Sequence, residues 1–175
     1  MKKLLLIAFV LFFNKAVFSQ SSVSGMLNSL ILPSSGGVFR GVNFYMMEDE
    51  LAELEESRYN VTFSYEDIDE AYYYYLGYDI DFDIDNYAYL DYVFDLYGIV
   101  EIYADVYLES NKLALDFYNA INAYYTNLLG PGTMDSDGWI LFEGQYEEDL
   151  FDLYIKLQKD AEYGDFVSLE IYYME

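Results

Sequence analysis

The sequence contains no cysteine and no histidine. Without cysteine no disulfide can cross-link the chain, so its stability must come from ordinary packing. The joint absence of both residue types removes Ser-His-Asp and Cys-His catalytic arrangements, thiolate nucleophiles and the usual zinc ligand sets. Most hydrolase mechanisms are thereby excluded, and we expect neither a bound metal nor a cofactor.

Basic residues are scarce: 8 lysines and arginines stand against 32 aspartates and glutamates, for a formal net charge of −24. Lys2, Lys3 and Lys15 lie before residue 20, so a chain that begins at Gln20 has 8 − 3 = 5 basic residues and a charge of 5 − 32 = −27. A field of this sign repels nucleic acid and anionic lipid, and it attracts cations and basic proteins. We therefore expect a basic protein partner and no nucleic acid.

The first 19 residues have the order of a cleavable signal peptide. Two lysines precede the apolar run Leu4–Phe13, and small or polar residues follow it. This run is too short for a membrane-spanning helix, which needs roughly 20 apolar residues. We predict cleavage near Ser19 and Gln20, an extracytoplasmic location that is periplasmic or secreted, and no stable membrane anchor.

Acidity alone often marks disorder, yet 54% of the residues are hydrophobic and 21% are aromatic. Such a composition is far from the low hydrophobicity of chains that fail to fold. Residues 20–37 mix serine and glycine with a short apolar patch, which predicts a flexible tether. The remaining length suits one hydrophobic core, so we expect a single domain over residues 38–175.

Residues 71–108 alternate apolar and polar side chains with a period of two. Apolar side chains occupy every second position from Tyr72 to Ile84, and the pattern recurs over 88–94 and 100–108. Gly77 is a point where the first, long segment could bend or break. Strict alternation is typical of strands with one buried and one wet face. Similar patterns at 139–143, 150–158 and 166–173 extend the prediction to an antiparallel meander.

Two segments have helical spacing instead. Met47–Glu56 is short and amphipathic, with acids in its first turn. Asn111–Leu129 has one long apolar stripe, with Ser110 as its N-cap and Gly130 at its end. We predict an α+β fold, in which the long helix packs on the apolar face of the antiparallel sheet and the short helix lies near the N-terminus.

The order of these segments resembles a broad class of small, exported, uncharacterised bacterial proteins. The matching motifs are an R-G-V-x-F strand at Arg40–Phe44, the helix from Met47, the helix end at Leu128–Gly132, Trp139, and L-x-I-x-Y at Leu169–Tyr173. The class is similar in fold to small outer-membrane-assembly lipoproteins and to β-lactamase-inhibitor proteins. This resemblance implies protein binding and no catalytic residues.

The abundance of acids raises two other possibilities. Among 32 acids, pairs at the roughly 5–10 Å spacing of glycosidase carboxylates arise by chance, so we expect no enzymatic activity. The run Asp79, Asp81, Asp83, Asp85 invites a calcium interpretation. An EF-hand loop from Asp79 would need glycine and glutamate where Ile84 and Leu90 stand. We predict a solvated strand face, on which two of these aspartates could share an ion.

The side chains that point outward from the predicted strands include tyrosines interleaved with acids. The candidate binding residues are Tyr73, Tyr75, Tyr87, Tyr89, Tyr103, Tyr107, Glu101 and Asp105, and the same parity includes Tyr154, Tyr172, Asp91 and Glu109. Tyrosine offers a large, rigid contact area with a polar tip, although it also stabilises exposed sheet faces through cross-strand pairs.

The leading hypothesis is therefore a binding or inhibitory module that presents this face to a basic protein. The alternatives are a weak cation or glycan binder and, third, a carboxylate-based glycan-acting enzyme. The oligomeric state stays open.

Overall fold

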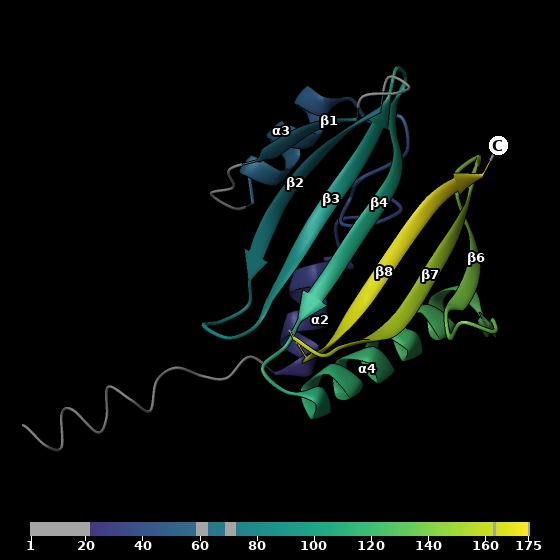
Figure 1. Cartoon of the computed structure of the whole chain (residues 1–175). Helices are drawn as coiled ribbons and strands as arrows, with labels where there is room; N and C mark the ends of the chain where they lie inside the picture. Colours follow the sequence, from purple (N-terminus) through teal and green to yellow (C-terminus); the bar gives the residue numbers. More distant parts are fainter. Residues whose placement is uncertain (1–21, 59–62, 69–72, 163, 175) are drawn as a thin grey trace, which may run out of the picture.

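The computed structural model describes residues 22–58, 63–68, 73–162 and 164–174, so the predicted signal peptide, residues 1–19, lies outside the described residues. The described residues form three helices and eight strands (Figure 1). The helices are α2 (Val23–Ile31), α3 (Glu48–Glu56) and α4 (Asn111–Leu129). The strands are β1 (Ser64–Ile68), β2 (Tyr73–Asp81), β3 (Tyr87–Asp95), β4 (Gly98–Tyr107), β5 (Thr133–Met134), β6 (Ile140–Tyr146), β7 (Asp149–Asp160) and β8 (Gly164–Met174). The predicted α+β class is confirmed.

All eight strands belong to one antiparallel sheet, in the order β1-β2-β3-β4-β8-β7-β6-β5. This order consists of two meanders, β1 to β4 and β5 to β8, each built from strands that are consecutive in the sequence. Helix α4 connects the two meanders, and β4 pairs with β8 where they meet (Figure 1). The predicted meander is thus correct for each half of the sheet.

The alternation in the sequence matches the two faces of the sheet. In β4, Ile102, Ala104 and Val106 are fully buried, whereas the residues between them are partly exposed. Strand β2 continues through Gly77 without a break, and a Cβ atom there would lie 2.2 Å from the Asp91 carboxylate. Gly77 therefore makes room for a neighbouring side chain and does not interrupt the strand.

All three helices pack on the apolar face of the sheet. Helix α4 begins as predicted, because the Ser110 hydroxyl accepts a hydrogen bond from the Leu113 amide at 3.3 Å. Its Phe117 and Ile121 are fully buried, and the helix contacts β6, β7 and β8. No helix of the described residues lies on the other face of the sheet (Figure 1).

Helix α2 corrects the prediction of a flexible tether over residues 20–37. Ser22 caps this helix, accepting a hydrogen bond from the Gly25 amide at 3.1 Å. Met26, Leu30 and Ile31 then lie on one helix face and are buried in the same core as the sheet. Their spacing is helical, and Ser24, Gly25 and Asn28 occupy the exposed side, so a composition typical of a loop concealed an amphipathic helix.

Two further details differ from the sequence expectations. Arg40–Phe44 does not form a strand; it contributes an isolated antiparallel bridge between Phe39 and Val42. The edge strands β1 and β5 were not predicted, because neither is long enough to display a clear alternation.

Among the described residues, no helix is both long and apolar enough to span a membrane.

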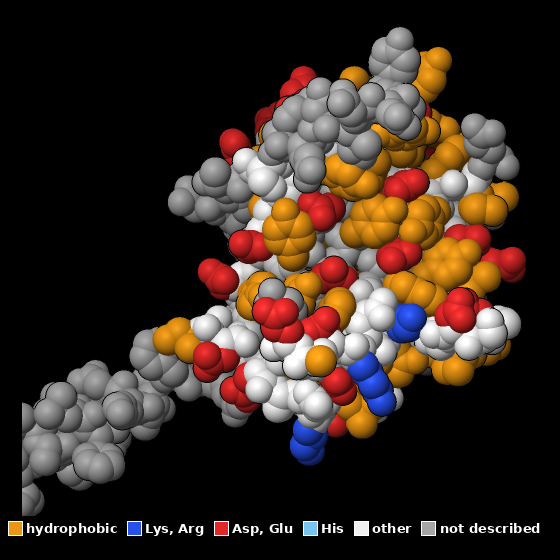
Figure 2. All heavy atoms as spheres, in the orientation of Figure 1, with side chains coloured by type: hydrophobic (Ala, Val, Ile, Leu, Met, Phe, Trp, Pro, Cys, Tyr) orange, Lys and Arg blue, Asp and Glu red, His pale blue; other side chains and the backbone are white. Residues whose placement is uncertain are grey.

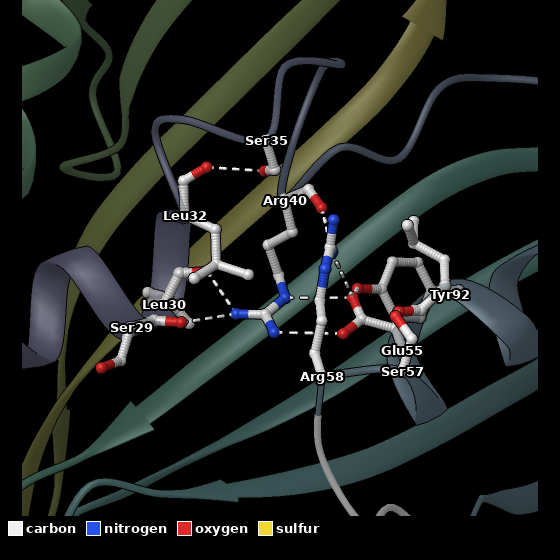
Figure 3. A network of polar contacts seen from close by, with 10 residues as sticks. Ser29, Leu30, Leu32, Ser35, Arg40, Glu55, Ser57, Arg58 and Tyr92 are labelled. Carbon is white, nitrogen blue, oxygen red and sulfur yellow. Dashed lines mark hydrogen bonds and ion pairs between the residues drawn. The ribbon is translucent and has the colours of Figure 1, made fainter.

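A buried ion pair joins α2, α3 and the sheet (Figure 3). Arg40 Nε lies 3.2 Å from Glu55 Oε1 in α3, and both side chains are completely shielded from solvent. The Arg40 guanidinium also donates to the main-chain oxygens of Ser29 and Leu30 at the end of α2, at 2.6 and 2.7 Å. From β3, the Tyr92 hydroxyl donates to Glu55 at 3.2 Å.

Burial acts to lower the pKa of Arg40, but the hydrogen bond with Glu55 and the electrostatic interactions with Tyr92, Tyr78 and Glu55 outweigh it and raise that pKa. Arg40 therefore stays charged. Its charge and its donors hold α2, α3 and the segment around Arg40 in one arrangement.

Candidate functional site

The sheet face opposite the helices, termed the open face, carries most of the outward tyrosines and acids. It is formed by Tyr73, Tyr75, Asp79 and Asp81 of β2, Tyr87, Tyr89 and Asp91 of β3, Glu101, Tyr103, Asp105 and Tyr107 of β4, Phe166, Ser168, Glu170 and Tyr172 of β8, and Asp152, Tyr154, Lys156 and Gln158 of β7. Figure 2 shows hydrophobic side chains and carboxylates interleaved across it. Lys156 is the one base in this set of described residues.

The strand register places tyrosines beside carboxylates. One row across β3, β4, β8 and β7 runs Asp91, Tyr103, Glu170, Tyr154, and the next runs Val93, Glu101, Tyr172, Asp152. Tyr103 and Tyr172 each have a carboxylate opposite them on both neighbouring strands. Residues directly opposite in a sheet lie about 4.5–5.5 Å apart, so each aromatic ring is flanked by acids within contact distance.

The aromatic rings cover one another's faces. Tyr107 stacks between Tyr87 and Phe166, with ring centroids 5.1 and 4.9 Å away and interplanar angles of 18° and 17°. These distances equal the spacing between strands, about 4.8 Å, so the rings stand upright on the sheet. Tyr172 makes edge contacts with Tyr103 and Tyr154 at 5.9 and 5.7 Å. Tyr107 thus presents its ring edge and hydroxyl to solvent, and not a free ring face.

The hydroxyls of three tyrosines are oriented by carboxylates. Tyr103 donates to Glu101 at 2.5 Å and Tyr172 donates to Glu170 at 2.6 Å, in each case to the acid two residues earlier on the same strand. Tyr154 and Asp152 repeat the arrangement at 3.4 Å. Burial, followed by the hydrogen bond to Glu101, raises the pKa of Tyr103, so its proton remains in place. Because these tyrosine hydroxyls already donate to carboxylates, the surface offers mainly hydrogen-bond acceptor oxygens.

The open face is hollowed at its centre. A depression of about 590 Å³ is lined by Ser64, Tyr75, Tyr89, Asp91, Tyr103, Asp105, Gln158, Phe166, Ser168 and Glu170. A second depression of about 430 Å³, on the β7 side, shares Glu170 and is walled by Trp139 and Tyr154. We call the first of these the central hollow. It combines three carboxylates with three tyrosines in a space large enough for a side chain or a small molecule.

Asp105 lies in the wall of the central hollow and is partly buried. Burial raises the pKa of its carboxyl, although the Ser168 hydroxyl, which donates to it at 2.6 Å, acts in the opposite direction. A raised pKa in the folded protein means that folding favours the protonated form. The stability that this preference contributes is complete below the ordinary carboxyl pKa and is lost as the pH rises through the raised pKa.

The Asp105→Asn variant is therefore expected to gain stability relative to the unmodified protein as the pH rises from 3 to 7. Asparagine carries no charge to desolvate, and it can still accept the Ser168 hydrogen bond. Thermal unfolding at both pH values measures the difference. Asp79→Asn, at an exposed position on β2, controls for the change in net charge. A difference in melting temperature that is equal at pH 3 and pH 7 would contradict the prediction.

Neither protein-family models, curated proteins nor solved structures match this chain. Its function must then follow from its own geometry.

The candidate residues from the sequence fall into three parts of the open face. Tyr75, Tyr89, Tyr103 and Asp105 come together around the central hollow. Tyr73 and Glu101 line a separate depression of about 720 Å³ toward the β3–β4 turn, with Tyr45 and Tyr97. Tyr87 and Tyr107 lie at the other end of the sheet, beside Asp85 and Glu109.

Sequence reasoning missed Phe166, Ser168 and Glu170, which complete the central hollow from β8. These residues alternate in step with Tyr172, which sequence analysis placed on the outward face of its strand without making it a candidate, so alternation could have identified them. Their pairing with β4, however, depends on the joining of the two meanders.

The four aspartates of the calcium hypothesis are divided by the β2–β3 turn. Asp79 and Asp81 are exposed on β2. Asp83 instead accepts hydrogen bonds from the Asn86 side chain at 2.6 Å and from the Asp85 amide at 3.2 Å, which stabilise the turn. Across the described part of the chain, no three acidic, cysteine or histidine side chains are grouped to hold a metal ion.

Proposed function

We propose that this protein is an extracytoplasmic binding or inhibitory module, without a catalytic role, whose open face binds a basic protein partner. The observation that carries the proposal is the central hollow, where Asp91, Asp105 and Glu170 lie among tyrosines. Ser168 donates to Asp105 and Tyr172 donates to Glu170, and no lysine or arginine is among the described residues that line the hollow. A lysine or arginine side chain of a partner would add a counter-charge and further donors to this cluster of three carboxylates.

The chemistry of the hollow favours a cationic side chain. Carboxylates attract the charge and accept its hydrogen bonds, and arginine can engage them in bidentate fashion. Tyrosine rings add a cation–π contribution of about 0.5–2 kcal/mol, depending on desolvation. The volume of about 590 Å³ lies within the range of roughly 300–1,000 Å³ that is typical of ligand pockets.

The arrangement of the rings favours a protein over a glycan. Aromatic residues that bind sugars offer a free ring face on which the sugar packs. On the open face, Tyr107 has both ring faces covered by Tyr87 and Phe166. The exposed edges and hydroxyls suit a partner rich in hydrogen-bond donors, which is also the character of a basic protein surface.

The electrostatic field supports rapid capture of such a partner. The net charge of −24 for the whole chain attracts a basic protein from a distance. Steering of this kind raises association rates by about 10- to 1,000-fold, and salt shortens its reach to about 8 Å at physiological ionic strength. Carboxylates are then expected to set the association rate, and the aromatic residues to slow dissociation.

An oligoarginine peptide provides a defined probe for surface plasmon resonance at several salt concentrations, with an oligocitrulline peptide as its neutral counterpart. We expect the double variant Glu101→Gln/Asp105→Asn to lower the association rate for oligoarginine about tenfold at low salt. Tyr103→Ala and Tyr107→Ala should mainly speed dissociation.

The matched control is the double variant Glu53→Gln/Glu56→Gln, which removes the same charge from exposed positions on α3. An equal loss of association rate in the control would show that net charge, and not the open face, attracts the peptide. Full affinity in both tyrosine variants would show that the aromatic residues only stabilise the sheet. Affinity capture with the unmodified protein then recovers physiological partners for the same measurements.

A further inference from the structure

The second depression of the open face, of about 430 Å³, combines aromatic rings with carboxylates over β7 and β8. We call it the aromatic corner. Its described lining consists of three aromatic residues, three acids and one methionine: Trp139, Tyr154, Tyr172, Asp135, Asp152, Glu170 and Met174. None of these described lining residues is basic. The volume lies within the range of roughly 300–1,000 Å³ that is usual for ligand sites.

The three rings of the aromatic corner meet at nearly right angles. The ring centroids of Trp139 and Tyr154 are 6.4 Å apart, with an interplanar angle of 89°. Those of Tyr154 and Tyr172 are 5.7 Å apart, at 81°. An edge-to-face contact covers at most one face of one of its two rings, whereas Tyr107 is stacked on both sides. Rings set at right angles therefore form adjoining walls, so that one cation can contact more than one ring.

A cation of the chain itself already uses one of these rings. Lys156 Nζ lies 5.2 Å from the centroid of the Trp139 ring, within the roughly 6 Å of a cation–π interaction. Lys156 is not one of the described residues that line the aromatic corner, so its ammonium group leaves that space to another cation.

The acids of the aromatic corner already accept hydrogen bonds from the chain. Asp135 accepts two from backbone amides of its own turn, both at 2.9 Å. Asp152 accepts one from the Tyr154 hydroxyl at 3.4 Å. Glu170 accepts one from the Tyr172 hydroxyl at 2.6 Å. The acids thus have donors but no basic residue beside them in the described lining. This suits a cation that has no N–H donors of its own and is less strongly hydrated than a lysine ammonium group.

We propose that the aromatic corner binds the quaternary ammonium group of a small organic cation such as choline. Aromatic side chains arranged around such a group are a recurrent means of recognising it, because its charge interacts with the ring faces. A phosphate attached to the ligand would be repelled by the three acids and by the net charge of −24. The free cation is therefore preferred over a phosphocholine headgroup. This site shares only Glu170 with the central hollow, and the inference does not require a protein partner.

Trp139 is the single tryptophan of the chain, so its fluorescence reports on this site when the full protein is titrated with choline. We expect a saturable change. The neutral isostere of choline, in which a tert-butyl group replaces trimethylammonium, should bind at least about tenfold more weakly, and so should phosphocholine. No saturable change with choline would overturn the site, and equal binding of the neutral isostere would overturn the role of charge. Tighter binding of phosphocholine than of choline would overturn the preference for a free cation.

Two matched pairs of variants test the location. Tyr154→Leu removes a ring and should lower the affinity for choline about 3- to 10-fold, whereas Tyr154→Phe keeps the ring and should bind choline like the unmodified protein. Asp152→Asn should also lower the affinity about 3- to 10-fold. Asp79→Asn removes the same charge from an exposed position on β2 outside the aromatic corner, and should have little effect. Equal affinities within either pair would overturn the assignment.

The result is separable from the binding of a basic protein. Neither Tyr154 nor Asp152 lines the central hollow, so their variants should leave the dissociation of oligoarginine from that hollow unchanged. Choline binding in a protein that fails to discriminate oligoarginine from oligocitrulline would refute the proposed function alone. Discrimination between these peptides without choline binding would refute the aromatic corner alone.

Discussion

The Arg40→Met variant is expected to lose about 3–5 kcal/mol of unfolding free energy, because it leaves the Glu55 carboxylate buried without its closest counter-charge. The two side chains share two hydrogen bonds of 3.2 Å and are shielded from solvent. Arg58, 3.7 Å from the same carboxylate, compensates only in part. The substitution also removes the donors to the last carbonyl groups of α2. Urea denaturation monitored by circular dichroism measures the change.

A double variant separates the loss of the pair from the loss of one partner. Arg40→Met with Glu55→Met removes both charges and is expected to be less destabilised than Arg40→Met alone, since apolar side chains of similar size can replace a buried ion pair. Lys112→Met breaks the exposed pair between Lys112 and Asp116 on α4 and should cost less than about 1 kcal/mol. Similar losses for Lys112→Met and Arg40→Met would contradict the assignment of a buried, uncompensated charge.

The Gly98→Ala variant is expected to lose about 2–6 kcal/mol, from backbone strain and steric overlap that each contribute about 1–3 kcal/mol. Gly98 begins β4 with a φ of +128°, and a Cβ atom there would lie 2.4 Å from the carbonyl carbon of Tyr45. The backbone of Tyr45 cannot easily move away from such a Cβ atom. Hydrogen bonds fix it to Ile99, from the Tyr45 amide to the Ile99 oxygen at 2.9 Å and from the Ile99 amide to the Met46 oxygen at 3.1 Å.

Gly138→Ala is the matched control for Gly98→Ala. Gly138 also has a positive φ, +86°, but a Cβ atom there meets nothing within 4 Å. Only the conformational strain remains, so the expected loss is about 1–2 kcal/mol. Thermal or urea unfolding of both variants isolates the cost of the close approach at Gly98. Equal destabilisation would indicate that the contact with Tyr45 relaxes without cost.

Local patterns in the sequence were sufficient for most of the secondary structure. The period of two assigns side chains to the two faces of a strand, and Tyr103, Asp105 and Tyr107 accordingly lie on the open face of β4. The limits of α4 follow from Ser110 as a cap and from Gly130, which has a φ of +96° at the end of the helix. Both signals depend only on residues close together in the chain.

Such local patterns do not predict contacts between residues that are far apart in the sequence. Arg40 and Glu55 are separated by 15 positions, and nothing in either local segment indicates that they pair in the core. The central hollow requires the register of β4 against β8, which brings Asp105 to Ser168 across 63 positions. The cavity of about 320 Å³ between Leu32, Tyr125 and Phe151 likewise needs three segments that sequence analysis assigns separately, one of them as a tether.

The junction of β4 and β8 also has a consequence for folding kinetics. Each meander consists of hairpins that pair neighbouring segments and close short loops, whereas the junction must bring residues 101–107 to residues 166–172. Contacts of such long range are entropically expensive and are expected to form late. Because the central hollow straddles this junction, a partly folded chain with two intact meanders would still lack it. Binding of a basic probe during refolding would then appear only with the final phase, which makes it a sensor of completed folding.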